Sequence, residues 1–400
     1  MKRIAVITAT RAEYGLLSPI IKALRKYEKI NELKIDLVVT GTHLSPDYGM
    51  TVSEIQERID VRIEIPVQSA TALDISYNQA EALIKFTELF VNETYDAVII
   101  LGDRYEMLAV AIAAGNTRTP IFHIAGGDTT EGAIDEWIRH AITKISYLHF
   151  VTNEESRKRV IQLGEEPERV FNYGSTSIDN ILSLPLMSKQ EALNSIGLNI
   201  GFNIGLMADC KDCRYALCTY HPVTMNNESV DEMIKNLLDA VSSFPELQFI
   251  ITKSNADQGG ARINRLLDEA EVKIDNVHVF TSLGVKRYLS LMKHAEFVLG
   301  NSSSGIIETP ALHVPTVNIG DRQRGRLQSE SVINCGDKTE EIVKAIKTAL
   351  TDKHKRLCQE VVSPYGDGHA AEKIANKTVE TVMNNKIDLK KKFYDLRCRI

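Results

Sequence analysis

The amino-acid sequence predicts an α/β protein with two Rossmann-like halves, each a doubly wound parallel sheet covered by helices. Short apolar segments alternate with stretches whose apolar residues recur at helical spacing, and this alternation is typical of βα units and parallel strands. The alternation breaks at a proline-containing segment around residues 178–188 and then starts again. We therefore expect one domain over residues 1–180, a second over residues 181–375, and a C-terminal helix or tail over residues 376–400.

In the first half, strands are predicted where short runs are almost entirely apolar, as is typical of strands buried on both faces. Helices are predicted where apolar residues recur every three or four positions. The strands are expected at residues 4–8, 34–39, 97–101, 121–124 and 148–151, and the helices at residues 16–27, 75–91, 107–114, 134–146 and 154–162.

The second half repeats the pattern. Its strands are expected at residues 215–219, 248–251, 278–280, 297–299 and 316–319, and its helices at residues 230–243, 260–271 and 285–293. Ligands of open α/β sheets bind outside the carboxyl ends of the strands. Polar residues that directly follow a predicted strand are therefore the candidates for function.

Composition and charge exclude several classes of function. The net charge of −6 over 400 residues argues against a surface that binds nucleic acid. No uncharged apolar segment is long enough to span a bilayer, and the first apolar run ends at Arg11 and Glu13, too soon for a signal peptide. We expect a cytoplasmic protein that has neither nucleic acid nor a membrane as a partner.

The six cysteines are too few and too scattered for a disulfide framework in a chain of this length. Cys210 and Cys213 form a single CxxC pair. A structural zinc site needs a second pair of ligands, for which Cys218 and His221 are the nearest candidates. We favour a reduced loop over a zinc site.

A turn of small hydroxyl residues begins at Gly300 and follows the predicted strand 297–299. Small residues let a phosphate approach closely, and the free N–H groups of a helix N-terminus attract it. Ser302 and Ser303 are thus candidate phosphate ligands, and Glu308 could reach the hydroxyl groups of a ribose. The alternative is an ordinary serine-rich helix cap.

Charged residues follow two strands of the first half. Arg11 comes soon after the first strand, where it is placed to meet a phosphate or a base. Asp103 and Arg104 follow the apolar strand 97–101; the aspartate could act as a general acid or base, and the arginine could pair with a phosphate or a carboxylate. The alternatives are a surface arginine at position 11 and a helix-capping aspartate with a solvent-facing arginine at positions 103 and 104.

The densest set of ionisable residues lies next to glycines. Two glycines follow strand 121–124 and allow a close backbone approach, and Asp128 comes next. Asp135 and Arg139 then share one face of the following helix, because they are four residues apart. A solvated, salt-bridged helix face is the alternative, but the glycines at the strand end favour a function.

Three strand ends of the second half carry further candidates. Pro222 favours extended geometry for His221, although a single histidine is often structural. Asn255 and Arg322 each follow a predicted strand. His221 and Arg322 would supply cationic or donor groups near the serine turn.

In this order, the motifs of the chain resemble those of the hydrolysing UDP-N-acetylglucosamine 2-epimerases. The resemblance covers most of the chain, and the ordered set is more specific than any single motif. The matching segments are Arg-Ala-Glu-Tyr-Gly at 11–15, Gly-Asp-Arg at 102–104, His-Ile-x-Gly-Gly-Asp at 123–128, Ile-Asp-x-x-Ile-Arg-His at 134–140, His-Pro-Val-Thr at 221–224, Gly-Asn-Ser-Ser-Ser-Gly-Ile-Ile-Glu at 300–308 and Asn-Ile-Gly-Asp-Arg-Gln at 318–323.

The resemblance implies a glycosyltransferase-B-like fold, with two Rossmann-like domains and the active site in the cleft between them. It also implies the reaction. Loss of the C2 proton and expulsion of UDP from the UDP-sugar substrate give 2-acetamidoglucal, and water then adds with inverted configuration at C2 to give N-acetylmannosamine, a sialic acid precursor. By the same resemblance neither a metal nor a nicotinamide cofactor takes part, and the protein is a homo-oligomer, a dimer or a tetramer.

The resemblance also implies roles for individual residues. Asp103 and Asp135 are the acid/base candidates, and Arg139 orients a carboxylate or the diphosphate. The positions that match diphosphate contacts are His221, Ser302, Ser303 and Arg322. The positions that match nucleoside contacts are Glu308 for the ribose, with Arg11 and Asn255 on the nucleotide side.

One position departs from the family pattern. Some relatives carry a catalytic glutamate where this chain has Ala125, and alanine cannot move a proton. Asp128, three residues later, is the candidate replacement, or the proton transfers follow a different scheme. The departure affects the acid/base assignment more than the nucleotide site.

Three other functions stay open. Enzymes of the same family act on UDP-2,4-diacetamido-2,4,6-trideoxyglucose in legionaminic acid synthesis and have nearly the same motifs. A retaining glycosyltransferase with a UDP-sugar donor would share the fold and the phosphate turn, but it would not need the carboxylates of the first half. A non-catalytic sensor of nucleotide sugars is the third possibility.

Overall fold

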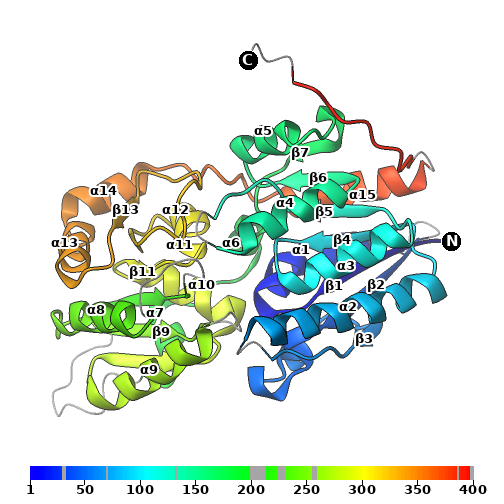
Figure 1. The fold of residues 1–400 in the computed structure, drawn as a ribbon. Coiled ribbons are helices and arrows are strands. Elements are labelled where there is room, and N and C mark those ends of the chain that lie inside the picture. The colour runs from blue at the N-terminus through cyan, green and yellow to red at the C-terminus, as the bar shows by residue number, and fades with distance from the viewer. Residues whose placement is uncertain are drawn as a thin grey trace. The chain divides into compact units, whose positions relative to one another are not determined.

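The chain folds into two units, each a parallel sheet with helices on both faces (Figure 1). The first unit contains Met1–Thr129, Ile134–Leu182 and Tyr365–Ile400, and the second contains Thr130–Ala133 and Ser183–Pro364. This computed structural model describes residues 1–28, 33–68, 71–130, 133–198, 213–222, 230–254, 259–384 and 387–396.

The sheet of the first unit has seven parallel strands in the order β3-β2-β1-β4-β5-β6-β7. The strands are β1 (Lys2–Thr8), β2 (Leu33–Thr40), β3 (Val61–Ile63), β4 (Ala97–Leu101), β5 (Ile121–Ile124), β6 (Leu148–Val151) and β7 (Val170–Asn172). The helices are α1 (Arg11–Glu28), α2 (Ala72–Asn92), α3 (Tyr105–Asn116), α4 (Asp135–Ile145), α5 (Glu154–Gln162), α6 (Thr176–Ser183) and α15 (Ala370–Met383). Short 3-10 turns lie at Gly41–Leu44, Pro46–Tyr48, Thr51–Glu54 and Pro167–Arg169.

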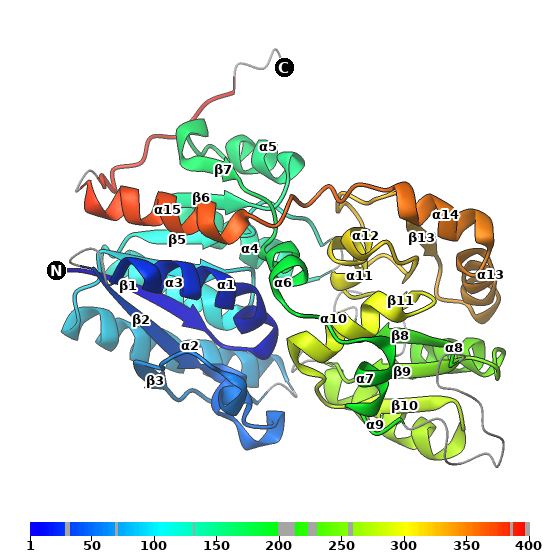
Figure 2. The same ribbon diagram turned by 180° about the vertical axis from the view of Figure 1, so that it is seen from behind.

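Both faces of this sheet are buried, and the side chains of β1 alternate between them. Ile4 and Val6 pack with α1 and α15 in one hydrophobic core, and Figure 2 shows these two helices side by side. Ala5 and Ile7 point to the opposite face, where α2, α3 and α4 cover the sheet. The period of two residues explains why the strand is apolar throughout. The packing of α15 on α1 also places the chain from Tyr365 onward in the first unit.

The sheet of the second unit has six parallel strands in the order β10-β9-β8-β11-β12-β13. The strands are β8 (Tyr215–Thr219), β9 (Gln248–Thr252), β10 (Val277–Phe280), β11 (Val298–Gly300), β12 (Thr316–Ile319) and β13 (Val332–Cys335). The helices are α7 (Lys189–Asn194), α8 (Val230–Ser242), α9 (Gly260–Lys273), α10 (Gly284–His294), α11 (Ser304–Ile307), α12 (Thr309–Leu312), α13 (Thr339–Ala349) and α14 (Asp352–Glu360).

Two of the differences from the sequence prediction have a plain physical cause. The strands β3, β7 and β13 were not predicted, because each lies at the edge of a sheet and is too short and too polar to form a continuous apolar run. The helix expected after the serine turn is divided at Glu308 into α11 and α12. Pro310 explains the break, since it has no N–H to donate to the carbonyl group four residues earlier.

Strand order reverses once in each sheet, and these points locate the candidate site. In the first unit the reversal lies between β1 and β4, and in the second it lies between β8 and β11. Loops that leave neighbouring strands in opposite directions open a crevice at the carboxyl ends, and ligands of doubly wound sheets bind there. Among the described residues, no helix is both long and apolar enough to cross a bilayer.

A substitution at Gly300 would test how closely β8 and β11 must approach each other. Its φ is 127°, and a Cβ atom at this position would lie 2.1 Å from the carbonyl oxygen of Thr219. We expect Gly300→Ala to lower the free energy of unfolding of the second unit by roughly 1–3 kcal/mol, because the strands must move apart. Urea denaturation measures this difference.

Gly197→Ala is the matched control. Its φ is also positive, at 76°, but no described atom lies within 4 Å of its added Cβ. It therefore reports the conformational strain alone. Equal losses of stability in the two variants would show that the contact with Thr219 is unimportant.

Candidate functional site

In the first unit, the buried guanidinium of Arg139 contacts two carboxylates and one strand-end backbone carbonyl. Its side chain is 1% exposed, and it forms an ion pair with Asp103. It also donates to Glu136 at 3.1 Å and to the backbone carbonyl of Asp128 at 2.6 Å. Burial lowers the pKa of Arg139, but the charges of Asp103 and Asp128 outweigh this effect and raise it. The arginine is therefore a permanent cation that fixes both strand-end loops.

Asp103 keeps part of its carboxylate open to solvent. It follows β4, and its side chain is 25% exposed although its partner Arg139 is buried. The ion pair holds the carboxylate in one orientation, and the exposed part remains accessible to a substrate. An oriented, accessible carboxylate is what a general acid or base requires.

Asp128 is held differently. It is 5% exposed, and one oxygen of its carboxylate accepts hydrogen bonds from Thr152 at 2.8 Å and Ser156 at 2.5 Å. Asn153 lies at 3.5 Å from the same oxygen. These donors follow β6, so the aspartate ties the loop after β5 to the next strand. The contacts favour a supporting role for Asp128 over that of the principal base.

Steric crowding explains why glycine precedes Asp128. A Cβ at Gly127 would lie 2.3 Å from the carbonyl oxygen of Ser156, and Gly127 has a positive φ of 78°. Ala125 also has a positive φ, 61°, which is uncommon for a residue with a side chain. The turn therefore runs close to α5 and directs the backbone of Asp128 toward Arg139.

Asp135 and Arg11 occupy the helix starts that the sequence predicts. Asp135 is the first residue of α4 and is partly exposed, one helical turn before Arg139. Arg11 is the first residue of α1 and is also partly exposed. Both residues thus begin helices that follow strands of the same sheet as Asp103.

Arg104 has a partner that the sequence did not reveal. Its Nε atom donates to both oxygens of Glu106, at 3.1 and 3.2 Å, and Glu106 is completely buried. Glu13 is a second buried carboxyl group near the same guanidinium. Sequence reasoning missed Glu13 and Glu106 because charged residues in a first helical turn are usually solvated. Arg104 is thus bound to its own chain, which counts against a direct role in binding the nucleotide.

In the second unit, Asn301 connects the loops on both sides of the strand reversal. It is fully buried, and its side-chain amide bonds to the N–H and to the carbonyl of His221, at 2.7 and 2.8 Å. The carbonyl oxygen of Asn301 accepts hydrogen bonds from Arg322 at 3.1 Å and from Gln323 at 2.8 Å. Three predicted segments therefore meet at one residue that the sequence placed only within a motif.

The serine turn follows β11 as predicted, and its residues are partly exposed. Ser302 accepts a hydrogen bond from the N–H of Ser304 at 3.4 Å. Ser303 caps α11, and the carbonyl of Ser303 accepts from Ile307 at 3.0 Å. Burial raises the pKa of Glu308 to about 7. A ribose hydroxyl would favour the ionised form of Glu308 by donating to it.

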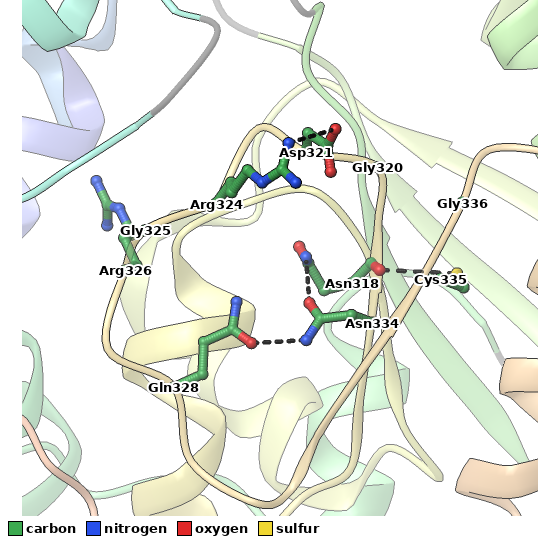
Figure 3. A pocket seen from close by; sticks show the side chains of 10 residues that line it. All are labelled: Asn318, Gly320, Asp321, Arg324, Gly325, Arg326, Gln328, Asn334, Cys335 and Gly336. Atoms are coloured by element: carbon green, nitrogen blue, oxygen red, sulfur yellow. Dashed lines mark hydrogen bonds and ion pairs between the residues drawn. The ribbon is translucent and has the colours of Figure 1, made fainter.

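A polar pocket of about 550 Å³ lies at the carboxyl ends of β12 and β13 (Figure 3). Asn318 donates to Asn334 at 2.8 Å, and Asn334 donates to Gln328 at 2.7 Å. Arg324 pairs with Asp321 on the opposite side of this row of amides. The volume is that of ordinary ligand pockets. The loop that brings Arg322 to Asn301 thus also borders a polar space.

Two of the predicted positions cannot be placed. Asn255 and Cys210 lie outside the residues that the structure describes. The zinc alternative is not supported by the remaining positions: Nδ1 of His221 lies 3.2 Å from the hydroxyl of Ser254, and burial raises the pKa of the Cys218 thiol to about 12.

Comparison with known proteins agrees with this geometry. Residues 25–378 match the sequence profile of UDP-N-acetylglucosamine 2-epimerases. The chain belongs to this family. It is 38% identical over 99% of its length to the polysialic acid biosynthesis protein P7 of Escherichia coli, of which it covers 98%. It is also 38% identical, over 83% of its length and 84% of the relative, to the GDP/UDP-N,N'-diacetylbacillosamine 2-epimerase (hydrolyzing) of Campylobacter jejuni.

A solved structure agrees with the fold. The UDP-GlcNAc 2-epimerase of Neisseria meningitidis, crystallised with UDP-GlcNAc, matches 96% of this chain and 100% of its own, with a TM-score of 0.75 and 22% identity. The prediction of two Rossmann-like units of the glycosyltransferase-B-like kind is confirmed.

Ser303 tests the phosphate turn. If the turn binds the diphosphate of a UDP-sugar, Ser303→Asp should weaken UDP binding by roughly tenfold or more, since like charges in contact cost several kcal/mol. Isothermal titration with UDP measures the change. Ser242→Asp, on the exposed end of α8, adds the same charge elsewhere in the unit and should leave the affinity unchanged. Unchanged affinity in a folded Ser303→Asp variant would remove the turn from the site.

Proposed function

We propose that the protein is a hydrolysing UDP-N-acetylglucosamine 2-epimerase that converts UDP-N-acetylglucosamine and water into N-acetylmannosamine and UDP. Family membership supports a UDP-sugar epimerase. The observation that carries the hydrolysing mechanism is the ion pair of Asp103 with the buried Arg139. A glycosyltransferase or a nucleotide-sugar sensor would not need an accessible carboxylate held in this way.

The chemistry requires a base and a stabilised leaving group. The C2–H bond of the sugar is weakly acidic, so a positioned carboxylate must take the proton as the C1–O bond to UDP breaks. This gives 2-acetamidoglucal and UDP. Water then adds its hydroxyl group at C1, and a proton reaches C2 from the opposite face. We assign these proton transfers to Asp103 and Asp135, with Asp128 holding the loop beside them.

The departing diphosphate gains negative charge as the bond breaks, so it needs donors that are already in place. In our proposal His221, Ser302, Ser303 and Arg322 supply them, and Glu308 binds the ribose. Asn301 supports this assignment, because its hydrogen bonds already hold the backbone of His221 and the loop of Arg322 in place. Arg11 and Asn255 remain proposals for the nucleotide side.

The name of one relative supports an alternative substrate. The Campylobacter jejuni protein is named for diacetylbacillosamine, which is a 2,4-diacetamido-2,4,6-trideoxy sugar, and it is as similar in sequence as the Escherichia coli relative named for polysialic acid. Incubating the enzyme with each UDP-sugar, without acceptor, and comparing kcat/KM decides between them. A higher value for the diacetamido substrate would replace the proposed sugar and keep the mechanism.

Deuterium oxide tests the elimination. The C2 proton must be lost and then replaced from solvent, so N-acetylmannosamine formed in D₂O should carry deuterium at C2. NMR of the released sugar measures this. Direct hydrolysis at C1 would leave hydrogen at C2 and retain the configuration of N-acetylglucosamine, and that product would refute the proposal.

Asp103→Asn tests the base. The variant keeps the shape of the side chain but cannot take a proton, so kcat should fall by roughly 10²-fold or more while UDP binding persists. Asp135→Asn is measured in parallel to decide whether that residue shares the task. Asp275→Asn, on an exposed position of the second unit, is the control and should be unaffected. Near-normal turnover of Asp103→Asn would reduce Asp103 to a structural partner of Arg139.

A further inference from the structure

Glu13 is a buried carboxyl group that the proposed reaction does not use. It lies in the first turn of α1 and is 5% exposed. One of its oxygens accepts hydrogen bonds from the N–H groups of Ala9 at 2.8 Å and Thr10 at 3.0 Å. The N–H of Glu13 donates to the hydroxyl of Thr10 at 3.3 Å. These reciprocal contacts form a capping box, which fixes the turn between β1 and α1.

This turn carries Arg11 and borders the strand reversal of the first unit. Further contacts hold its other side, because the carbonyl of Ala9 accepts from the N–H of His43 at 3.2 Å and from the hydroxyl of Thr42 at 3.0 Å. Movement of Glu13 would therefore displace Arg11, the first residue after the turn. A residue that acts in this way positions the site without touching the substrate.

The charges around Glu13 leave it without a counter-ion of its own. Arg104 is the cation that interacts with it, but this guanidinium already contacts both oxygens of Glu106, which is completely buried. Two buried carboxyl groups thus share one cation. A buried charge without a partner is expensive, so one of the two should keep its proton. The geometry selects Glu13, because Glu106 has the direct ion pair.

The other titratable groups that face this turn do not change the assignment. Arg11 precedes Glu13 on the same helix, and Asp103 follows β4 and pairs with Arg139. Burial lowers the pKa of His43 to about 4, so this side chain is neutral above that pH. Among the described residues, no group forms a hydrogen bond with the second oxygen of Glu13.

We propose that Glu13 is a positioning residue of the epimerase, which in its neutral, protonated form holds the turn that carries Arg11, and that its ionisation sets an alkaline limit to activity. This inference rests on the proposed function for its kinetic part. The claim that Glu13 is protonated concerns the folded protein and does not depend on the proposed function.

The direction of the pH dependence follows from burial. Burial and the charge of Glu106 raise the pKa of Glu13, against the opposing effect of Arg104, to about 8 from the model-peptide value of 4.5. The folded state therefore binds the proton more tightly than the unfolded state. The stabilisation from this proton is complete below about pH 4.5 and is lost progressively as the pH rises through about 8.

The kinetic experiment compares Glu13→Gln, Glu13→Ala and the wild type from neutral to alkaline pH. Glutamine mimics the protonated acid and can still accept from Ala9 and Thr10, so this variant should keep most of its neutral-pH activity and should lose the decline in kcat/KM above about pH 8. Alanine removes the cap, and its kcat should fall roughly tenfold or more at every pH, since a displaced site reacts slowly. Glu191→Gln is the matched control.

Glu191 makes the same capping box with Ser188 at the start of α7, but it is exposed. Its variant should follow the wild-type pH profile. Because every variant meets the same substrate, ionisation of the substrate cancels in the comparison. An alkaline decline that is the same in Glu13→Gln and the wild type would overturn the proposal, as would a neutral-pH loss in Glu13→Gln equal to that of Glu13→Ala.

Thermal unfolding separates this inference from the proposed function. The melting temperature of the wild type, relative to that of Glu13→Gln, should fall between about pH 4.5 and 8 and level off above that range. Glu191→Gln should show no such trend. If the wild type releases no epimerised sugar but the melting curves diverge as expected, the proposed function fails and the protonated Glu13 stands. Parallel melting curves refute the neutral form of Glu13 whatever the enzyme does.

Discussion

A buried guanidinium is stable only when carboxylates or carbonyl groups accept hydrogen bonds from it. In the first unit, Arg139 has such acceptors. Its guanidinium contacts Asp103, Glu136 and the carbonyl of Asp128, which come from the loops after β4 and β5 and from α4. Removing one partner of such a buried pair costs about 3–5 kcal/mol. The cost gives the loops one stable arrangement, and the orientation of Asp103 depends on it.

The second unit joins its loops through a neutral residue, Asn301. The side-chain amide of Asn301 accepts from the N–H of His221 and donates to the carbonyl of His221. The backbone carbonyl of Asn301 accepts hydrogen bonds from Arg322 and Gln323. A buried amide can satisfy a donor and an acceptor at once, so Asn301 holds the backbone of His221 without a charge of its own. The carbonyl of Asn301 brings no negative charge to the place where our proposal puts the diphosphate. The carboxylates around Arg139 and the donor groups around Asn301 thus lie in different units.

The sequence predicted the central strands well and the contacts of the site poorly. The bounds of β4, β5, β6, β8 and β12 agree with the prediction to the residue, because strands buried on both faces are apolar throughout. Edge strands such as β3 face solvent and lack that signal. Asp103 and His221 could be chosen as candidates because each directly follows a predicted strand. The pairing of Asp103 with Arg139 could not be predicted, because it spans 36 positions in the chain and depends on the order of the strands. The burial of Glu106 was equally hidden, since a carboxylate in a helix normally predicts a solvated face.

Ala125 shows how strand-end geometry constrains the chemistry. Its backbone has a positive φ, and its N–H donates to the carbonyl of Phe150 at 2.8 Å, so this residue joins the loop after β5 to β6. A left-handed residue is a poor place for a long side chain that must hold one orientation. Three residues later the carboxylate of Asp128 is fixed by Thr152 and Ser156, which makes it well oriented but already occupied. Asp103 is an accessible carboxylate with a rigid cationic partner, and in our proposal the proton transfer therefore moves to the loop after β4, in place of the missing glutamate.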